Sequence, residues 1–173
     1  SGGPLLHNEP KELNDPTTHR HNELPVRSRM FIKIQDGCDA RCTYCIVPQV
    51  RPTISSYPQT KIISEAKYLV SRGCKEIILT GIRLGKYAQI NPPQSPFFKG
   101  GKSSGLIELL KQLKDIPDLV RIRLSSLEIT EVTDELLEFI IPPENKICHH
   151  LHLPLQSGSD KILNLMRRTY NTN

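Results

Sequence analysis

Three closely spaced cysteines are the residues of this sequence best suited to chemistry. Cys38, Cys42 and Cys45 follow the spacing C-x₃-C-x₂-C, and no fourth ligand lies close to them. Cysteine thiolates bind iron–sulfur clusters or zinc, and a loop this short can place all three around one inorganic centre. On a four-iron cluster, three cysteine ligands leave one iron without a protein ligand, and a small molecule can be chelated there.

A structural zinc site is the alternative for this loop. Zinc prefers four closed ligands, so a further ligand would have to come from a distant segment containing Cys148, His149, His150 and His152. Disulfides are disfavoured, because the chain has five cysteines, an odd number, and three of them are crowded into one loop. With no apparent signal peptide, we expect a chain in the reducing cytoplasm.

Composition is typical of one globular domain. The chain has 173 residues, of which 37% are hydrophobic and 24% charged, and this length allows a core of useful size. It contains no run of about eighteen apolar residues, so neither a membrane span nor a membrane partner is expected. The net charge of +5 is compatible with a nucleic-acid partner. Because the basic residues are spread along the chain, however, charge alone favours solvated surfaces.

Strand-like and helix-like segments alternate along the chain. Residues 1–28 are interpreted as a flexible leader or interdomain linker, and residues 29–173 as the core domain. The predicted strands are 29–35, 76–80, 119–125 and 148–155. The predicted helices are 61–72, 106–114, one capped by Thr130 that ends at Ile141, and one capped by Ser159 that runs into Arg167 and Arg168. A loop is predicted at 88–105.

Four successive βα units predict an α/β fold with a parallel sheet and helices outside it. In such folds the loops at the carboxyl ends of the strands carry function. The cysteine loop follows the first predicted strand directly, and further polar segments follow the other strands. These segments are Leu79–Tyr87, Arg123–Glu128, His150–Asp160 and Leu165–Arg168.

The cysteine loop, with Tyr44 just before its third cysteine, resembles the signature of the radical S-adenosylmethionine (SAM) enzymes. Its flanks and the polar segments resemble the methylthiotransferase branch, over residues 29–170. The resemblance implies an open, TIM-like radical SAM barrel of six βα units, of which this chain supplies about four, so that it is truncated at its C-terminal end. It also implies a [4Fe-4S] cluster on Cys38, Cys42 and Cys45 with SAM on the open iron. A second [4Fe-4S] cluster is expected on an N-terminal domain that is missing here.

The implied function is that of a transferase that installs a methylthio group at C2 of N6-threonylcarbamoyladenosine 37 in tRNA. The cofactor carries the chemistry, and no residue is assigned a catalytic role. An electron donor such as flavodoxin or ferredoxin is expected, DNA is not, and this chain alone is not expected to be fully active. Methylthiolation of isopentenyladenosine or of a ribosomal protein is an alternative, and so is an inactive metal- or RNA-binding module.

Seven residues are predicted to contact SAM by this resemblance: Tyr44, Thr80, Gly81, Ser125, Ser126, Glu128 and Gln156. Ordinary loop packing is the alternative for Tyr44, and turn geometry is the alternative for Gly81, Ser125 and Ser126.

Three arginines are candidates for contacts to phosphate. A solvated role or one at a helix C-terminus is preferred for Arg51, Arg167 and Arg168. Cys74 and Cys148 are interpreted as buried thiols. Three positions depart from the family pattern, namely Pro52, Ala88 and Ile129, and Pro52 removes a backbone donor close to the cysteine loop.

Overall fold

Alternating apolar side chains build the sheet of this domain. The computed structural model describes residues 27–88 and 105–173. Residues 1–26 of the predicted leader (1–28) and residues 89–104 of the predicted loop (88–105) lie outside the described residues. Within the described residues, no helix is long and apolar enough to cross a bilayer.

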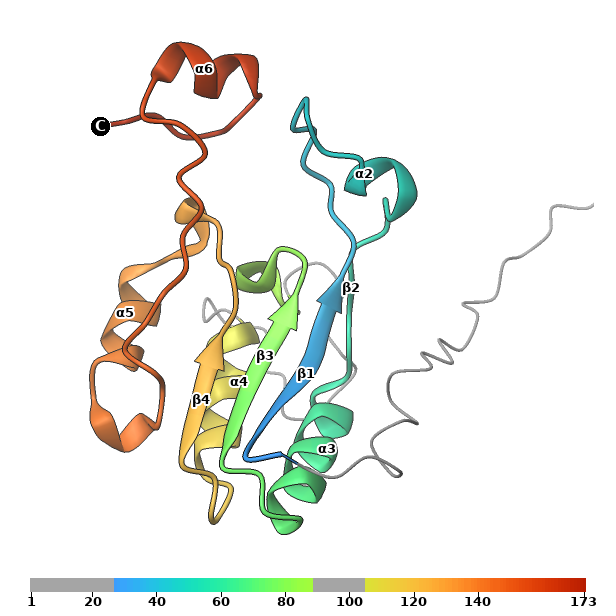
Figure 1. Cartoon of the computed structure of the whole chain (residues 1–173), viewed down its shortest axis with the longest axis vertical. Helices are drawn as coiled ribbons and strands as arrows, with labels where there is room; N and C mark the ends of the chain where they lie inside the picture. The colour runs from blue at the N-terminus through green and yellow to red at the C-terminus, as the bar shows by residue number, and fades with distance from the viewer. Residues whose placement is uncertain (1–26, 89–104) are drawn as a thin grey trace, which may run out of the picture.

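Three parallel strands and one short antiparallel strand form a single curled sheet (Figure 1). The strands are β1 (Arg29–Asp36), β2 (Ser55–Ser56), β3 (Glu76–Gly81) and β4 (Arg121–Leu124), in the spatial order β2-β1-β3-β4. In the parallel pairs, Ile32 lies opposite Leu79, and Ile77 lies opposite Ile122. These apolar side chains are almost completely buried, so the strand register also aligns the core.

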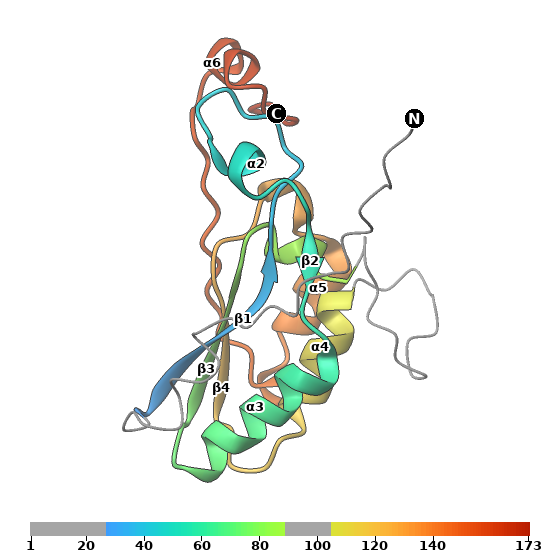
Figure 2. The same ribbon diagram turned by 90° about the vertical axis from the view of Figure 1, so that its right-hand side faces the viewer.

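Two amphipathic helices cover one face of the sheet (Figure 2). They are α3 (Gln59–Ser71) and α4 (Gly105–Lys114), and α5 (Asp134–Ile140) follows β4. The hydrophobic core lies between the sheet and α3 and α4, and includes Ile34, Ile62, Leu69, Leu106 and Leu110. The remaining short helices are α2 (Val47–Val50), η2 (Leu84–Lys86), η3 (Ile129–Glu131), η4 (Pro143–Asn145) and α6 (Asp160–Leu165). The predicted α/β class and partial barrel are confirmed.

The fourth predicted strand is not a regular strand. Within 148–155 the chain forms only the isolated parallel bridge Ser126–His152, and the bridge Ile122–Ile147 lies just before it. The chain turns locally here, because the His150 N–H donates to the Cys148 carbonyl at 2.7 Å, and Pro154 has no N–H to continue a ladder. The leucine–histidine alternation therefore marks an extended segment beside β4 that does not pair continuously.

Two predicted helix limits are also corrected. Thr133, not Thr130, caps α5, and its hydroxyl accepts from the Leu136 N–H at 3.2 Å. Thr130 lies in the preceding turn η3. Ser159 is the N-cap residue of α6 but makes no side-chain capping bond, and α6 ends at Leu165, before the two arginines. The carboxyl ends of β1, β3 and β4 point towards the end of the molecule where α2 and α6 lie (Figure 1).

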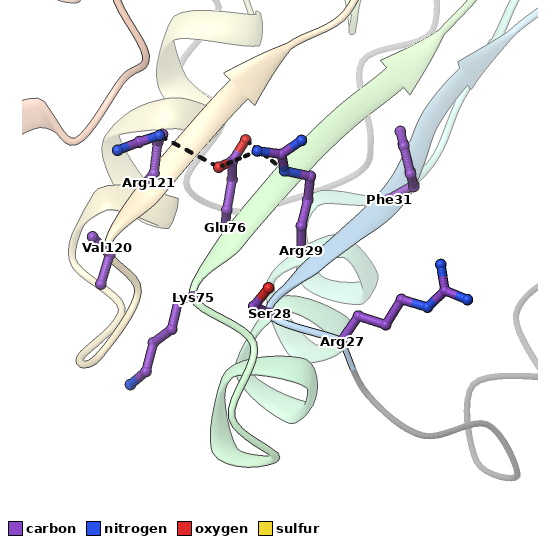
Figure 3. A pocket seen from close by; sticks show the side chains of 8 residues that line it. All are labelled: Arg27, Ser28, Arg29, Phe31, Lys75, Glu76, Val120 and Arg121. Atoms are coloured by element: carbon purple, nitrogen blue, oxygen red, sulfur yellow. Dashed lines mark hydrogen bonds and ion pairs between the residues drawn. The ribbon is translucent and has the colours of Figure 1, made fainter.

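A cluster of ion pairs ties the opposite ends of the parallel strands together (Figure 3). The Glu76 carboxylate on β3 accepts from the Arg123 Nε at 2.8 Å, and lies 3.2 Å from the Arg29 Nε and 3.6 Å from the Arg121 Nη1. The cluster borders a cavity of about 540 Å³ that is otherwise lined by Arg27, Ser28, Phe31, Lys75 and Val120. One buried carboxylate therefore connects β1, β3 and β4 through their arginines.

Replacing Glu76 with glutamine is expected to lower the free energy of unfolding by about 2 kcal/mol at neutral pH, because hydrogen bonds to charged groups contribute about 1.5–3 kcal/mol. Burial by itself would raise the pKa of Glu76, but the Arg123 hydrogen bond and the charges of Arg29 and Arg121 hold it below its usual value of 4.5. The stabilisation is therefore present above pH 4.5 and is lost as pH falls through the lower pKa of the folded protein.

Urea unfolding of both proteins between pH 7 and pH 3 measures this effect, and the two stabilities should converge in acid. The matched control is Glu138→Gln, at an exposed glutamate of α5, which should change little. If the free energies of unfolding of Glu76→Gln and the unmodified chain differ by a constant amount down to pH 3, the ion pairs of Glu76 are not the source of the stabilisation.

Candidate cluster and SAM site

The cysteine loop is held at the carboxyl end of β1 by contacts around its base. The Gly37 N–H donates to the Asp36 carboxylate at 2.8 Å, and the Cys38 N–H donates to the Arg51 carbonyl at 3.1 Å. The Arg51 Nη1 also pairs with the Asp36 Oδ1 at 3.1 Å. Arg51 is exposed and is the C-cap residue of α2, as predicted, and its side chain also closes the base of the loop.

The three cysteines line one pocket, with a volume of about 250 Å³. Most of the predicted SAM contacts share its wall with them, namely Tyr44, Gly81, Ser126, Glu128 and Gln156. Among the described residues that line this pocket, Thr80 and Ser125 are not found. Thr80 donates to the Ile32 carbonyl at 3.5 Å, and the Ser125 N–H donates to the Leu79 carbonyl at 3.1 Å. The structure thus brings together segments from four separate parts of the chain.

Gly81 permits close packing of β3 on β1. A methyl group at this position would lie 2.8 Å from the Gln35 carbonyl oxygen, closer than carbon and oxygen atoms approach. The buried Gln35 side chain then reaches the next turn, donating to the Arg83 carbonyl at 2.6 Å and accepting from the Ser56 hydroxyl at 2.7 Å. Strand packing therefore accounts for glycine at position 81, whether or not a ligand also approaches it.

Arg83 is a pocket residue that the sequence analysis did not single out. Its backbone is left-handed, with a φ of 55°, and its Nε contacts the Glu131 carboxylate at 2.5 Å. Burial alone would lower the pKa of Arg83, but the hydrogen bond and charge of Glu131 raise it. Left-handed backbone at an arginine has no sequence signal, since glycine and asparagine are the usual residues there.

Arg168 is the largest departure from the sequence predictions. Its side chain is only 6% exposed, whereas a solvated or helix-terminal role was preferred. It donates to the Cys42 Sγ at 3.3 Å and to the Tyr44 hydroxyl at 3.4 Å, and it forms an ion pair with Glu128. Its neighbour Arg167 is exposed, as predicted. The Ser126 hydroxyl lies 2.7 Å from the His152 Nδ1, across the isolated bridge.

The arrangement of the thiols fits a cluster of several atoms. Among the described residues, no three histidine, cysteine, aspartate or glutamate side chains converge tightly enough to hold one metal ion. Tetrahedral zinc needs its sulfur ligands about 2.3 Å from a single ion. An iron–sulfur cluster instead takes each cysteine at a different iron. Three thiols that line one pocket are a donor set that fits an iron–sulfur cluster.

Comparison with known proteins identifies the family. Residues 32–173 match the model of the radical SAM superfamily, so the chain belongs to this superfamily. The family implies a [4Fe-4S] cluster and SAM as cofactors, as the resemblance of the cysteine loop implied.

Individual relatives narrow the likeness to methylthiotransferases. The chain is 38% identical over 165 residues to threonylcarbamoyladenosine tRNA methylthiotransferase MtaB of Rickettsia prowazekii, covering 95% of this chain and 37% of that protein. It is 41% identical over 142 residues to MtaB of Aquifex aeolicus, covering 82% and 32%. It is 39% identical over 152 residues to tRNA-2-methylthio-N(6)-dimethylallyladenosine synthase of Syntrophus aciditrophicus, covering 85% and 30%. The chain thus spans about a third of the length of these relatives.

Proposed function

We propose that this chain is the radical-generating core of a tRNA methylthiotransferase that acts at C2 of N6-threonylcarbamoyladenosine 37. The observation that carries the proposal is the pocket in which the three loop cysteines meet residues of all four downstream polar segments. The names of the Rickettsia and Aquifex relatives support the substrate. We assign residues 29–173 to the core domain and residues 1–28 to a leader or linker.

Cys38, Cys42 and Cys45 are the proposed ligands of the cluster. When bound, a reduced cluster with SAM supplies the one-electron chemistry needed to attack the unreactive C2–H bond of an adenine. The residues of this chain bind and orient SAM. Polar groups of Ser126, Glu128 and Gln156 face the pocket, where carboxylate, amide and hydroxyl groups suit the ribose and amino-acid parts of SAM.

The other residues predicted to contact SAM have more limited roles in this proposal. Tyr44 offers a ring at the pocket edge for stacking, since 52% of the residue is exposed. Gly81 lets a ligand approach the backbone of β3. Thr80 and Ser125 lie beside Gly81 and Ser126 in the chain and act through backbone position.

Two partners follow from the proposed reaction. A protein electron donor such as flavodoxin or ferredoxin has to reduce the cluster, and tRNA brings the base. A second [4Fe-4S] cluster, implied by the methylthiotransferase relatives, would deliver the sulfur from another part of the whole protein. We place the reaction in the cytoplasm, because the relatives named above are tRNA-modifying enzymes.

Disrupting the gene that encodes this chain tests the substrate. Mass spectrometry of nucleosides from total tRNA should then show loss of 2-methylthio-N6-threonylcarbamoyladenosine and accumulation of its unthiolated precursor. The methylthio derivative of isopentenyladenosine should stay at its normal level. A gene copy with Cys42→Ala should fail to restore the lost nucleoside, whereas a Cys148→Ala copy should restore it.

The same experiment decides between the proposal and its alternative. The likeness to the Syntrophus relative favours a dimethylallyl (isopentenyl) substrate as the second candidate. Loss of methylthio-isopentenyladenosine alone would establish that candidate and overturn the first. If both nucleosides persist, neither tRNA substrate is correct.

A further inference from the structure

Two segments far apart in the chain meet at the cysteine loop. The Thr43 N–H donates to the Met166 carbonyl at 3.2 Å, and the Thr43 hydroxyl donates to the Leu165 carbonyl at 3.1 Å. The Arg168 Nη1 adds a bond to the Cys42 Sγ at 3.3 Å. Both views show α6 at the same end of the molecule as the loop and α2 (Figures 1 and 2). The C-terminal end of α6 is thus bonded directly to the cysteine loop.

The helix α6 depends on this contact for its position. It has six residues, and Leu163 is the only one of them that is buried. Isolated helices of fewer than about 12 residues are marginal in water, so a helix this short needs outside contacts. The hydrogen bonds from Thr43 and Arg168 are such contacts, and they order the loop at the same time.

A turn after α6 aims Arg168 at the loop. Arg167 adopts a left-handed φ of 56°, a backbone conformation that is strained for a non-glycine residue. The Arg168 N–H closes this turn by donating to the Leu163 carbonyl at 2.9 Å. Continued helix would carry Arg168 around the helix axis, so the strained residue redirects its side chain towards Cys42.

The buried guanidinium of Arg168 has more N–H donors than it has acceptors in contact. Its Nη1 bonds Cys42 and Tyr44, its Nη2 bonds Glu128, and the Tyr170 ring lies 5.1 Å from it. The Nε is buried and has no partner among the described residues. Buried donors are nearly always satisfied, and Arg168 lines the pocket. The pocket contact and the bond from the Nη1 to the Cys42 Sγ place the positive charge of Arg168 beside the proposed cluster site.

We propose that Arg168 is a positioning residue that bonds the Cys42 sulfur, locks α6 onto the cysteine loop and raises the reduction potential of the cluster bound there. The inference rests on the proposed function, because it needs a cluster on Cys42. Hydrogen bonds to ligand sulfur and nearby positive charge both stabilise the reduced cluster, which carries one more negative charge. Glu128 partly offsets that positive charge, and the bond to sulfur remains.

A redox titration of the anaerobically reconstituted chain, followed by electron paramagnetic resonance, tests the proposal. Arg168→Gln should bind as much iron as the unmodified chain but have a lower potential. At a fixed ambient potential the ratio of reduced to oxidised cluster should fall about tenfold, equivalent to 59 mV for a one-electron couple. Arg168→Lys keeps the charge but loses the planar fork, so its potential should fall by less.

Two further variants separate the possible causes. Arg167→Gln is the matched control, because Arg167 is the exposed neighbour, and it should leave the potential unchanged. The double variant Arg168→Gln/Glu128→Gln removes the carboxylate that the first change leaves unpaired. Its potential should stay below that of Glu128→Gln alone if the bond to the Cys42 sulfur matters.

The outcomes distinguish this inference from the proposed function. If Arg168→Gln and Arg168→Lys both load iron and keep the unmodified potential, Arg168 has only a structural role and the inference is wrong. If Arg168→Gln fails to bind iron, the reduction potential of Arg168→Lys is compared with that of the unmodified chain instead. An unchanged potential in Arg168→Lys would then mean that the inference is wrong. An unmodified chain that binds no iron would overturn the proposed function itself, and this inference with it.

Discussion

Replacing Cys38, Cys42 or Cys45 with alanine is expected to abolish the brown colour and the iron content of the reconstituted chain. The unmodified chain should bind about four iron atoms, as a single [4Fe-4S] cluster requires. Each of the three thiols lines the same pocket, and with three cysteine ligands the loop has no spare one. Iron and sulfide assays, with the absorbance of the cluster, measure the loss.

The two remaining cysteines provide the matched controls. Cys74 is fully buried beneath the sheet, and burial raises the pKa of its thiol, although hydrogen bonds to nearby backbone partly offset this. A thiol that stays protonated is a poor metal ligand. Cys148 is half-buried, not buried as predicted, and it lies in the extended segment beside β4, where its N–H donates to the Ile122 carbonyl at 2.8 Å.

Cys74→Ala and Cys148→Ala should therefore keep their iron, although the first should lose some stability because a buried atom is removed. Stoichiometric zinc in protein purified without oxygen would contradict the prediction. Iron that survives in all three loop variants would contradict it equally.

The parts of the fold that follow local rules were predictable from the sequence. The alternation of Met30, Ile32 and Ile34 predicted β1, and the apolar run 76–80 predicted β3, each within one residue of the observed strand. The position of the cysteine loop then followed, because functional loops of α/β folds lie at the carboxyl ends of strands. These features depend on a few neighbouring residues, which is the range over which a sequence pattern is informative.

The features that were missed depend on contacts between distant segments. Arg168 has an ordinary helix-terminal sequence, and its burial arises from bonds to Cys42 and Glu128, which lie 126 and 40 residues earlier in the chain. Arg83 sits in a left-handed turn held by Glu131. The extended segment at 148–155 has the alternation of a strand, but pairing is decided by its neighbour and by Pro154. The pattern of neighbouring residues in the sequence does not reveal contacts between distant segments.

Gly37→Ala is expected to destabilise the base of the cysteine loop, because the added methyl group would overlap the backbone of a neighbouring segment. Gly37 has a φ of 81°, and a methyl group would lie 1.9 Å from the Thr53 carbonyl oxygen and 2.6 Å from the Thr53 carbonyl carbon. Both are backbone atoms, so no side-chain rotation relieves the overlap. The segment beginning at Thr53 has to move away from the loop, and Cys38 next to Gly37 moves with it.

Gly73→Ala is the matched control for this change. Gly73 has a similar left-handed φ of 99°, but a methyl group there would meet nothing within 4 Å. Gly73→Ala should therefore cost only the backbone strain of a non-glycine residue, about 1–2 kcal/mol, and leave iron binding intact. Gly37→Ala bears the same strain together with the overlap, and should cost at least about 3 kcal/mol.

Urea unfolding and iron content of the two variants separate strain from displacement of the cysteine loop. The Gly37→Ala chain should retain the sheet signal in circular dichroism, because the core between β1, β3 and α3 does not include Gly37, but it should bind little iron. The reason is geometric: Cys38 is held by its N–H bond to the Arg51 carbonyl at 3.1 Å, and moving the segment at Thr53 disturbs that contact. Equal losses in stability and iron binding for both glycine variants would mean that backbone strain alone is responsible, and that close packing against Thr53 does not position Cys38.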